Sequence, residues 1–92
     1  MVALTRHAEE RARDRAVPPI VLDWLLSYGQ RMPAGDGAEC LFFDKNSRRK
    51  LQQNLGGWAY MKLESKFDAY AILASDGEVI TLGYRNKKIR RN

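Results

Sequence analysis

Two β-rich runs on either side of an Asp–Gly pair are the sequence feature that most constrains this fold. The runs 67–75 and 78–85 flank Asp76 and Gly77. An Asp–Gly pair between such runs is the strongest short-range signal for a β-hairpin, and a two-residue turn fixes its register. That register predicts a ladder of facing residues that includes Ser75/Glu78, Leu73/Ile80, Ile72/Thr81, Ala71/Leu82, Tyr70/Gly83, Ala69/Tyr84 and Asp68/Arg85.

The predicted register divides the hairpin into an apolar face and a face that becomes polar toward its open end. Tyr70 lies over Gly83 on the second face, where Asp68 and Arg85 are expected as cross-strand partners. Two interpretations of that pair stay open: a surface ion pair of little energetic value, or an arginine held in place for a phosphate. The apolar face, expected to cover the core, carries Leu73, Ile80, Ala71, Leu82, Ala69 and Tyr84.

The remaining chain predicts helices and short strands around this hairpin. Thr5 is a good N-cap for a helix over 6–15, and Pro18–Pro19 ends that helix and opens a second. The expected core side of the second helix carries Ile20, Val21, Trp24, Leu25 and Tyr28 at helical spacing. Further expected elements are strands over 30–32 and 38–43, a short helix over 48–55 with Asp44 or Ser47 as its N-cap, and a helical turn within 58–66.

These elements predict one α+β domain over residues 1–92 with a basic tail over 86–92. Its small antiparallel β-sheet is expected to have two N-terminal helices and one mid-chain helix packed on one face. No long apolar run is present, so a membrane span is not expected. Cys40 is the only cysteine, which suits a cytoplasmic protein, and its apolar neighbours predict a small buried residue.

The charge balance favours a polyanionic partner. Sixteen Lys and Arg against eleven Asp and Glu give a net charge of +5. RNA, DNA or an acidic protein fits that charge, and a merely soluble basic domain is an equally good interpretation. One His and one Cys cannot build a zinc site, and no motif indicates a metal, a cofactor or a small-molecule ligand.

Two clusters of basic residues could bind phosphates. The first lies on the polar side of the expected 48–55 helix, and the second lies in the tail, where a solvated terminus is the alternative to a phosphate-binding arm. The clusters consist of Lys45, Arg48, Arg49 and Lys50, and of Lys87, Lys88, Arg90 and Arg91.

The first helix carries a set of residues that could do chemistry. His7, Arg11 and Arg15 recur every four residues, so they share one helix face. Positive charge beside an imidazole favours its neutral form, which acts as a base. Together with fixed cations, such a base can cleave RNA without a metal, by taking the 2′-hydroxyl proton while arginines stabilise the phosphorane. The alternative is a surface histidine between exposed arginines.

Both ends of the chain resemble a known family. Residues 5–17, TRHAEERARDRAV, look like the H-A-x-x-R-x-x-x-R opening of small bacterial domains of unknown function. Residues 78–85, EVITLGYR, followed by the basic tail, resemble the closing strand of the same chains. These domains are grouped with the RelE/ParE-type toxins in the barnase–EndoU–colicin–RelE (BECR) ribonuclease fold. The resemblance covers about a quarter to a third of the chain.

The resemblance implies a helical N-terminal half packed on an antiparallel sheet, and a ribosome-dependent or free endoribonuclease. His7 and Arg11 match the opening motif and Arg85 matches the terminal strand, so these three are the candidate catalytic residues. The first functional hypothesis is therefore a toxin-like endoribonuclease whose partner is RNA, free or ribosome-bound, or an acidic antitoxin-like protein. The second is a non-catalytic basic module, an inactive toxin relative, that binds nucleic acid or an acidic protein.

Overall fold

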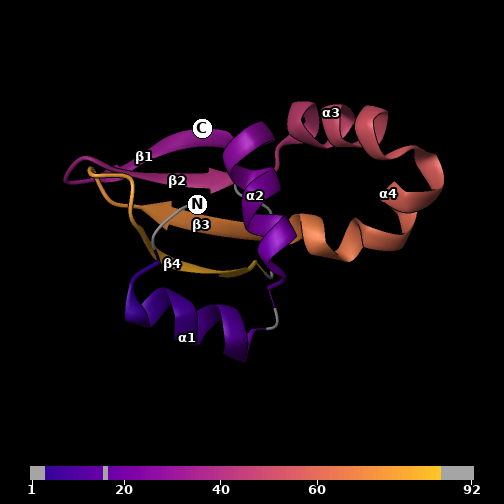
Figure 1. Cartoon of the computed structure of the whole chain (residues 1–92). Coiled ribbons are helices and arrows are strands. Elements are labelled where there is room, and N and C mark those ends of the chain that lie inside the picture. Colours follow the sequence, from indigo (N-terminus) through magenta and orange to yellow (C-terminus); the bar gives the residue numbers. More distant parts are fainter. Residues whose placement is uncertain (1–3, 16, 86–92) are drawn as a thin grey trace.

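The fold is a four-stranded antiparallel sheet accompanied by four α-helices, as described for residues 4–15 and 17–85 by a computed structural model (Figure 1). The α+β class expected from the sequence is confirmed. The elements are α1 (Arg6–Asp14), α2 (Pro19–Tyr28), β1 (Gln30–Gly35), β2 (Ala38–Phe42), α3 (Lys45–Leu55), α4 (Gly57–Leu63), the 3-10 helix η1 (Glu64–Asp68), β3 (Ala69–Leu73) and β4 (Val79–Tyr84).

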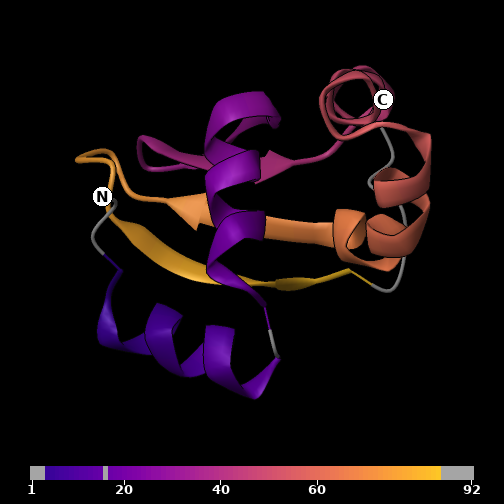
Figure 2. The same cartoon turned by 45° about the vertical axis from the view of Figure 1, so that its right-hand side comes forward.

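The strands follow one another in sequence order across the sheet, β1-β2-β3-β4. Helix α2 crosses one face of the sheet, and α1 lies beside the edge strand β4 (Figures 1 and 2). Helices α3 and α4 lie at the end of the sheet where β2 ends and β3 begins (Figure 2). No helix in the described part of the chain is long and apolar enough to cross a membrane.

Local capping signals determine where the helices begin. The Thr5 hydroxyl accepts the Ala8 N–H at 3.1 Å, as expected for the N-cap of α1. Asp44, rather than Ser47, is the N-cap of α3: its carboxylate accepts the Ser47 N–H at 2.8 Å and the Ser47 hydroxyl at 2.7 Å. Pro19 occupies the first turn of α2, where its missing N–H costs no hydrogen bond.

The apolar stripe of α2 is rotated relative to the sequence expectation. Val21, Leu22 and Leu25 are buried, whereas Ile20, expected in the core, is 49% exposed. The helix faces the sheet through the line from Val21 to Leu25, so Ile20, one residue earlier, lies about 100° around the helix from that line. Leu25 contributes to a core that also contains Leu41, Leu51, Phe67, Ala71 and Leu82.

The turn between β3 and β4 has three residues, so the predicted two-residue turn is wrong. Ala74 and Glu78 face each other, with the Ala74 N–H donating to the Glu78 carbonyl at 2.8 Å. The predicted type I′ turn needs positive φ at both central residues, but of Asp76 and Gly77 only Gly77 has it, at 88°. The Asp76 carboxylate instead accepts the Glu78 N–H at 2.9 Å.

This longer loop changes which residue of β4 enters the core. Leu73 faces Val79 rather than Ile80, and an irregularity next to this pair restores the predicted register from Ile72/Thr81 onward. Val79 is fully buried, whereas Ile80, expected on the core face, is 37% exposed. A β-bulge of this kind leaves one residue of its strand unpaired, which explains the outward position of Ile80.

Backbone contacts attach the start of α1 to the start of β4. The Thr5 N–H donates to the Val79 carbonyl at 2.9 Å, and Leu4 forms an isolated parallel bridge with Val79. Ala8 is completely buried, and its small side chain lets α1 lie close to this strand region. Helix α1 therefore runs beside β4 in the same direction, with Thr5 at the beginning of the strand.

Candidate nucleic-acid interface

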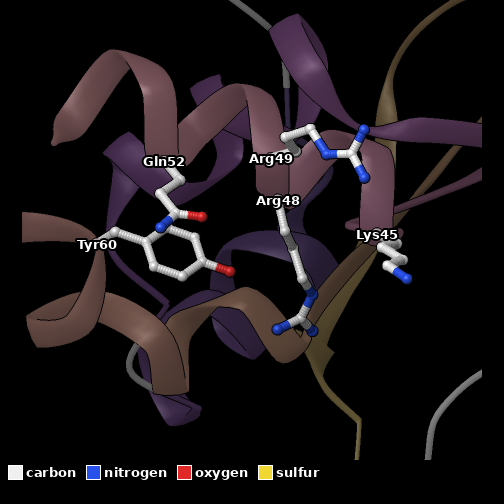
Figure 3. A pocket seen from close by; sticks show the side chains of 5 residues that line it. All are labelled: Lys45, Arg48, Arg49, Gln52 and Tyr60. Carbon is white, nitrogen blue, oxygen red and sulfur yellow. The ribbon is translucent and has the colours of Figure 1, made fainter. Parts of the chain in front are cut away.

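One face of α3 and the side of α4 enclose an open cationic pocket of about 240 Å³. Three α3 residues that follow Lys45 by three, four and seven positions share one helix face with it. Tyr60 reaches from α4 toward them (Figure 3). We call this site the α3 pocket, and its lining residues are Lys45, Arg48, Arg49, Gln52 and Tyr60.

The core anchors α3 while Lys45 and Arg49 stay exposed. Leu51 is fully buried, and Gly56, with a φ of 83°, ends the helix and lets the chain turn into α4. Within the described part of the chain, neither Lys45 nor Arg49 makes an ion pair. Both side chains are exposed, so their charges are available to a bound anion.

Arg48 plays a structural role at the inner wall of the pocket. Its Nη2 donates to the Phe67 carbonyl at 2.8 Å and to the Asp68 carboxylate at 3.1 Å, while its Nε donates to the Phe43 carbonyl at 3.3 Å. The side chain is only 28% exposed. Arg48 thus joins α3 to the end of β2 and to η1, and its charge faces one carboxylate.

Contact with the aromatic core holds the Tyr60 ring in position. Its ring stacks on Phe67, with ring centres 4.9 Å apart and an interplanar angle of 27°. Phe67 in turn contacts Phe43 and Trp24 at centre distances of 5.5 and 6.1 Å. The orientation of Tyr60 is therefore set by the core, and the ring is presented to the pocket in a fixed place.

Arg85 lies at the end of β4, close to Arg48 and Asp68. Its backbone N–H donates to the Asp68 carbonyl at 3.0 Å, so the predicted cross-strand position is confirmed. The Asp68 carboxylate, however, pairs with Arg48. Burial lowers the pKa of Arg85, and the charge of Arg48 acts in the same direction, while Cys40 and Asp68 oppose it. Arginine stays charged at neutral pH, so Arg85 is a partly desolvated cation.

Cys40 lies on the sheet face that carries Tyr70 and Ile72, opposite Met32 in β1. It is half-buried rather than fully buried. Burial raises the pKa of the Cys40 thiol, and the charge of Arg85 only partly offsets that effect. Because the thiolate is the reactive form, this environment does not favour a nucleophilic cysteine.

The predicted catalytic residues occupy two separate places. His7 is exposed on α1, where its Nε2 accepts a hydrogen bond from Arg11 Nε at 3.3 Å. Thr5, two residues before His7, contacts the start of β4, whereas Arg85 follows the end of β4. The five residue-to-residue steps from Ile80 to Arg85 span about 16 Å of extended chain. The fold therefore brings His7 to Arg11 and brings Arg85 to Arg48.

Arg15 approaches β4 between these two places. A Cβ atom built on Gly83 would lie 2.9 Å from Arg15 Cδ and Nη1, so the arginine lies directly over this glycine. Lys50 is exposed on α3 outside the pocket lining. The predicted phosphate-binding residues Lys87, Lys88, Arg90 and Arg91 lie outside the described residues.

Sequence reasoning missed two residues of the α3 pocket. Gln52 lies seven residues after Lys45 and three after Arg49, so helical periodicity alone could have placed it on the same face. Tyr60 had no comparable signal, because its segment matched both a helix and a strand. Comparison of the chain with protein-family models, with curated proteins and with solved structures returned no significant match.

Proposed function

We propose that the protein is a non-catalytic module that binds RNA through the α3 pocket. The observation that carries the proposal is the convergence of three cations with Gln52 and Tyr60 around one open pocket. Lysine and arginine bind backbone phosphates, and amide and phenol groups add hydrogen bonds to phosphate, sugar or base. The net charge of +5 supports attraction of a polyanion over a longer range.

The test compares two double variants that lose the same charge. Lys45→Gln/Arg49→Gln removes the two exposed cations of the pocket, and Arg6→Gln/Arg13→Gln removes two exposed arginines from α1. Fluorescence anisotropy measures binding of a labelled single-stranded RNA of about 12 nucleotides between about 50 and 200 mM salt. We expect the pocket variant to bind about 10-fold more weakly at low salt, with a salt slope smaller by about 1.4, because each phosphate contact contributes about 0.7.

The matched control should retain most of the affinity and of the salt slope, since α1 and α3 lie at different edges of the fold (Figure 2). Equal losses in both double variants would mean that net charge alone attracts RNA and would contradict a site. A polyglutamate of matched charge serves as competitor. If it displaces RNA at equal charge concentration, the pocket selects acidic chains in general, and an acidic protein becomes the better candidate partner.

RNA cleavage by His7 with Arg11 and Arg85 is the second candidate function. The contact of Arg11 Nε with His7 Nε2 at 3.3 Å favours it, because it places a phosphate-binding cation beside the only imidazole of the sequence. Incubation of RNA with the purified protein, followed by gel separation of the fragments, tests this candidate. If cleavage occurs, His7→Ala should abolish it while RNA binding at the α3 pocket persists. Cleavage that survives in His7→Ala would remove this mechanism.

The placement of His7 and Arg85 along β4 makes binding the better supported of the two functions. Arg85 lies beside Arg48 near the end of the strand, and His7 lies near its start. His7 contacts Arg11, so a phosphate cleaved with His7 as the base would have to bind at α1 rather than at Arg85. The kinship with RelE/ParE-type toxins stays a prediction from the two terminal motifs.

A further inference from the structure

Helix α4, which supplies Tyr60 to the α3 pocket, also exposes two large apolar side chains. Trp58 is 75% and Met61 is 73% exposed, well above Ile20 and Ile80, the other exposed large apolar residues of the described chain. Residues three apart lie on the same face of a helix, so Trp58 and Met61 form one patch. Burying a tryptophan is favourable, so a ring this exposed marks a surface that contacts something else.

A positive charge lies next to the Trp58 ring. Lys62 Nζ lies 5.4 Å from the ring centre, a cation–π distance. Helix α4 contains no acidic residue, and Glu64 directly follows it, three residues after Met61. The same helix supplies Tyr60 to the α3 pocket, where neither Lys45 nor Arg49 makes an ion pair with another described residue. A partner that covers Trp58 therefore meets cations on both sides, which fits a polyanion that also carries flat apolar groups.

Trp58 and Tyr60 lie on opposite sides of α4, since two residues correspond to about 200° of helix rotation. The ring is thus separated from the α3 pocket by roughly the width of one helix, about 10 Å. A single strand of about four nucleotides, the lower end of the site sizes of such proteins, is long enough to contact both places. Bases paired within a duplex are stacked on each other and cannot offer a free face to the ring.

We infer that Trp58 is a stacking platform for an unpaired base of the strand whose phosphates occupy the α3 pocket. This inference rests on the proposed function and specifies its ligand class as single-stranded nucleic acid. The indole ring supplies the apolar face for the base, and Lys62 holds the ring and attracts the adjacent phosphate. Stacking of this kind tolerates any sequence, because every base has a π face.

The experiment separates base stacking from phosphate binding. Three labelled ligands with equal numbers of phosphates are used: an oligouridylate of about 12 nucleotides, an abasic strand of the same length, and a duplex of matched phosphate number. Trp58→Ala should bind the oligouridylate on the order of 10-fold more weakly than the wild type, within the range for loss of one base–aromatic stack. Its affinity for the abasic strand should not change. Trp58→Phe should recover most of the loss.

Two further measurements fix the interpretation. Ile20→Ala, which shortens an exposed apolar side chain on α2, is the matched control and should bind like the wild type. The oligouridylate should quench part of the tryptophan emission of the wild type, and that quenching should disappear in Trp58→Ala, which retains Trp24. Salt-dependent binding with no Trp58 effect on any strand, or equally tight binding of the duplex, overturns this inference alone. Failure of every strand to bind overturns the proposed function as well.

Discussion

Phe67→Ala is expected to lower the free energy of unfolding by about 3–5 kcal/mol. Phe67 is 1% exposed and its ring contacts the rings of Trp24, Phe43 and Tyr60. Truncation removes apolar burial and leaves a cavity that three surrounding rings cannot fill without moving. A domain of this size has a total stability of about 5–14 kcal/mol, so the loss is a large fraction of it.

Urea denaturation followed by circular dichroism measures this loss. Trp58→Ala is the matched control, because it removes an aromatic ring that is 75% exposed, and it should change the stability by less than about 0.5 kcal/mol. The stability of Phe67→Leu should lie between the stabilities of Phe67→Ala and Trp58→Ala, since leucine keeps most of the buried volume. A Phe67→Ala protein as stable as Trp58→Ala would show that the aromatic cluster is not the anchor of the fold. Phe67→Ala should also weaken RNA binding, because Tyr60 loses its support.

Arg48→Met is expected to destabilise the protein by about 2–4 kcal/mol, since hydrogen bonds from charged groups contribute more than neutral ones. The substitution keeps the apolar stem but removes three hydrogen bonds, two of them to backbone carbonyls. Those bonds connect three segments that are distant in sequence: the start of α3, the end of β2 and η1. Loss of them should loosen the inner wall of the α3 pocket.

Arg49→Met is the control for Arg48→Met, because it removes an exposed guanidinium one residue further along the same helix. It should change the free energy of unfolding by less than about 0.5 kcal/mol while weakening RNA binding. Arg48→Lys should lose an intermediate amount of stability, since an ammonium keeps the charge but cannot reproduce the planar arrangement of donors. Equal stabilities of Arg48→Met and Arg49→Met would contradict the structural role of Arg48.

The features predicted correctly from the sequence are those that local chemistry decides. Thr5 as the N-cap of α1, Pro19 at the start of α2 and the pairing from Ile72/Thr81 to Ala69/Tyr84 all depend on residues close together in the chain or on strict alternation. The hairpin loop differs from the prediction: Val79 takes the core position expected for Ile80, and it contacts Leu4 and Thr5, which no short-range pattern reveals.

The residues of the candidate site also fall into two groups: those that the local sequence predicts and those whose position depends on tertiary contacts. Lys45, Arg48 and Arg49 belong to the basic side that was predicted for this helix together with Lys50, and the structure leaves Lys50 outside the pocket lining. Tyr60 was missed because its orientation depends on stacking with Phe67, which is a tertiary contact. The predicted meeting of His7 with Arg85 depended on which end of β4 receives the start of α1, and only the folded backbone determines that.

The contacts of Thr5 with Val79 and Ile80 limit the order in which segments of the chain can fold during synthesis. The hydrogen bond from the Thr5 hydroxyl to the Ile80 carbonyl joins residues 75 positions apart. During translation at about 5–20 residues per second, the first helix leaves the ribosome roughly 4–15 s before the strand that receives it. A nine-residue helix is too short to persist alone in water, so this segment waits as an unfolded, highly charged stretch. Its low apolar content makes that delay safe against aggregation, and docking of the N-terminal segment on β4 cannot precede the synthesis of that strand.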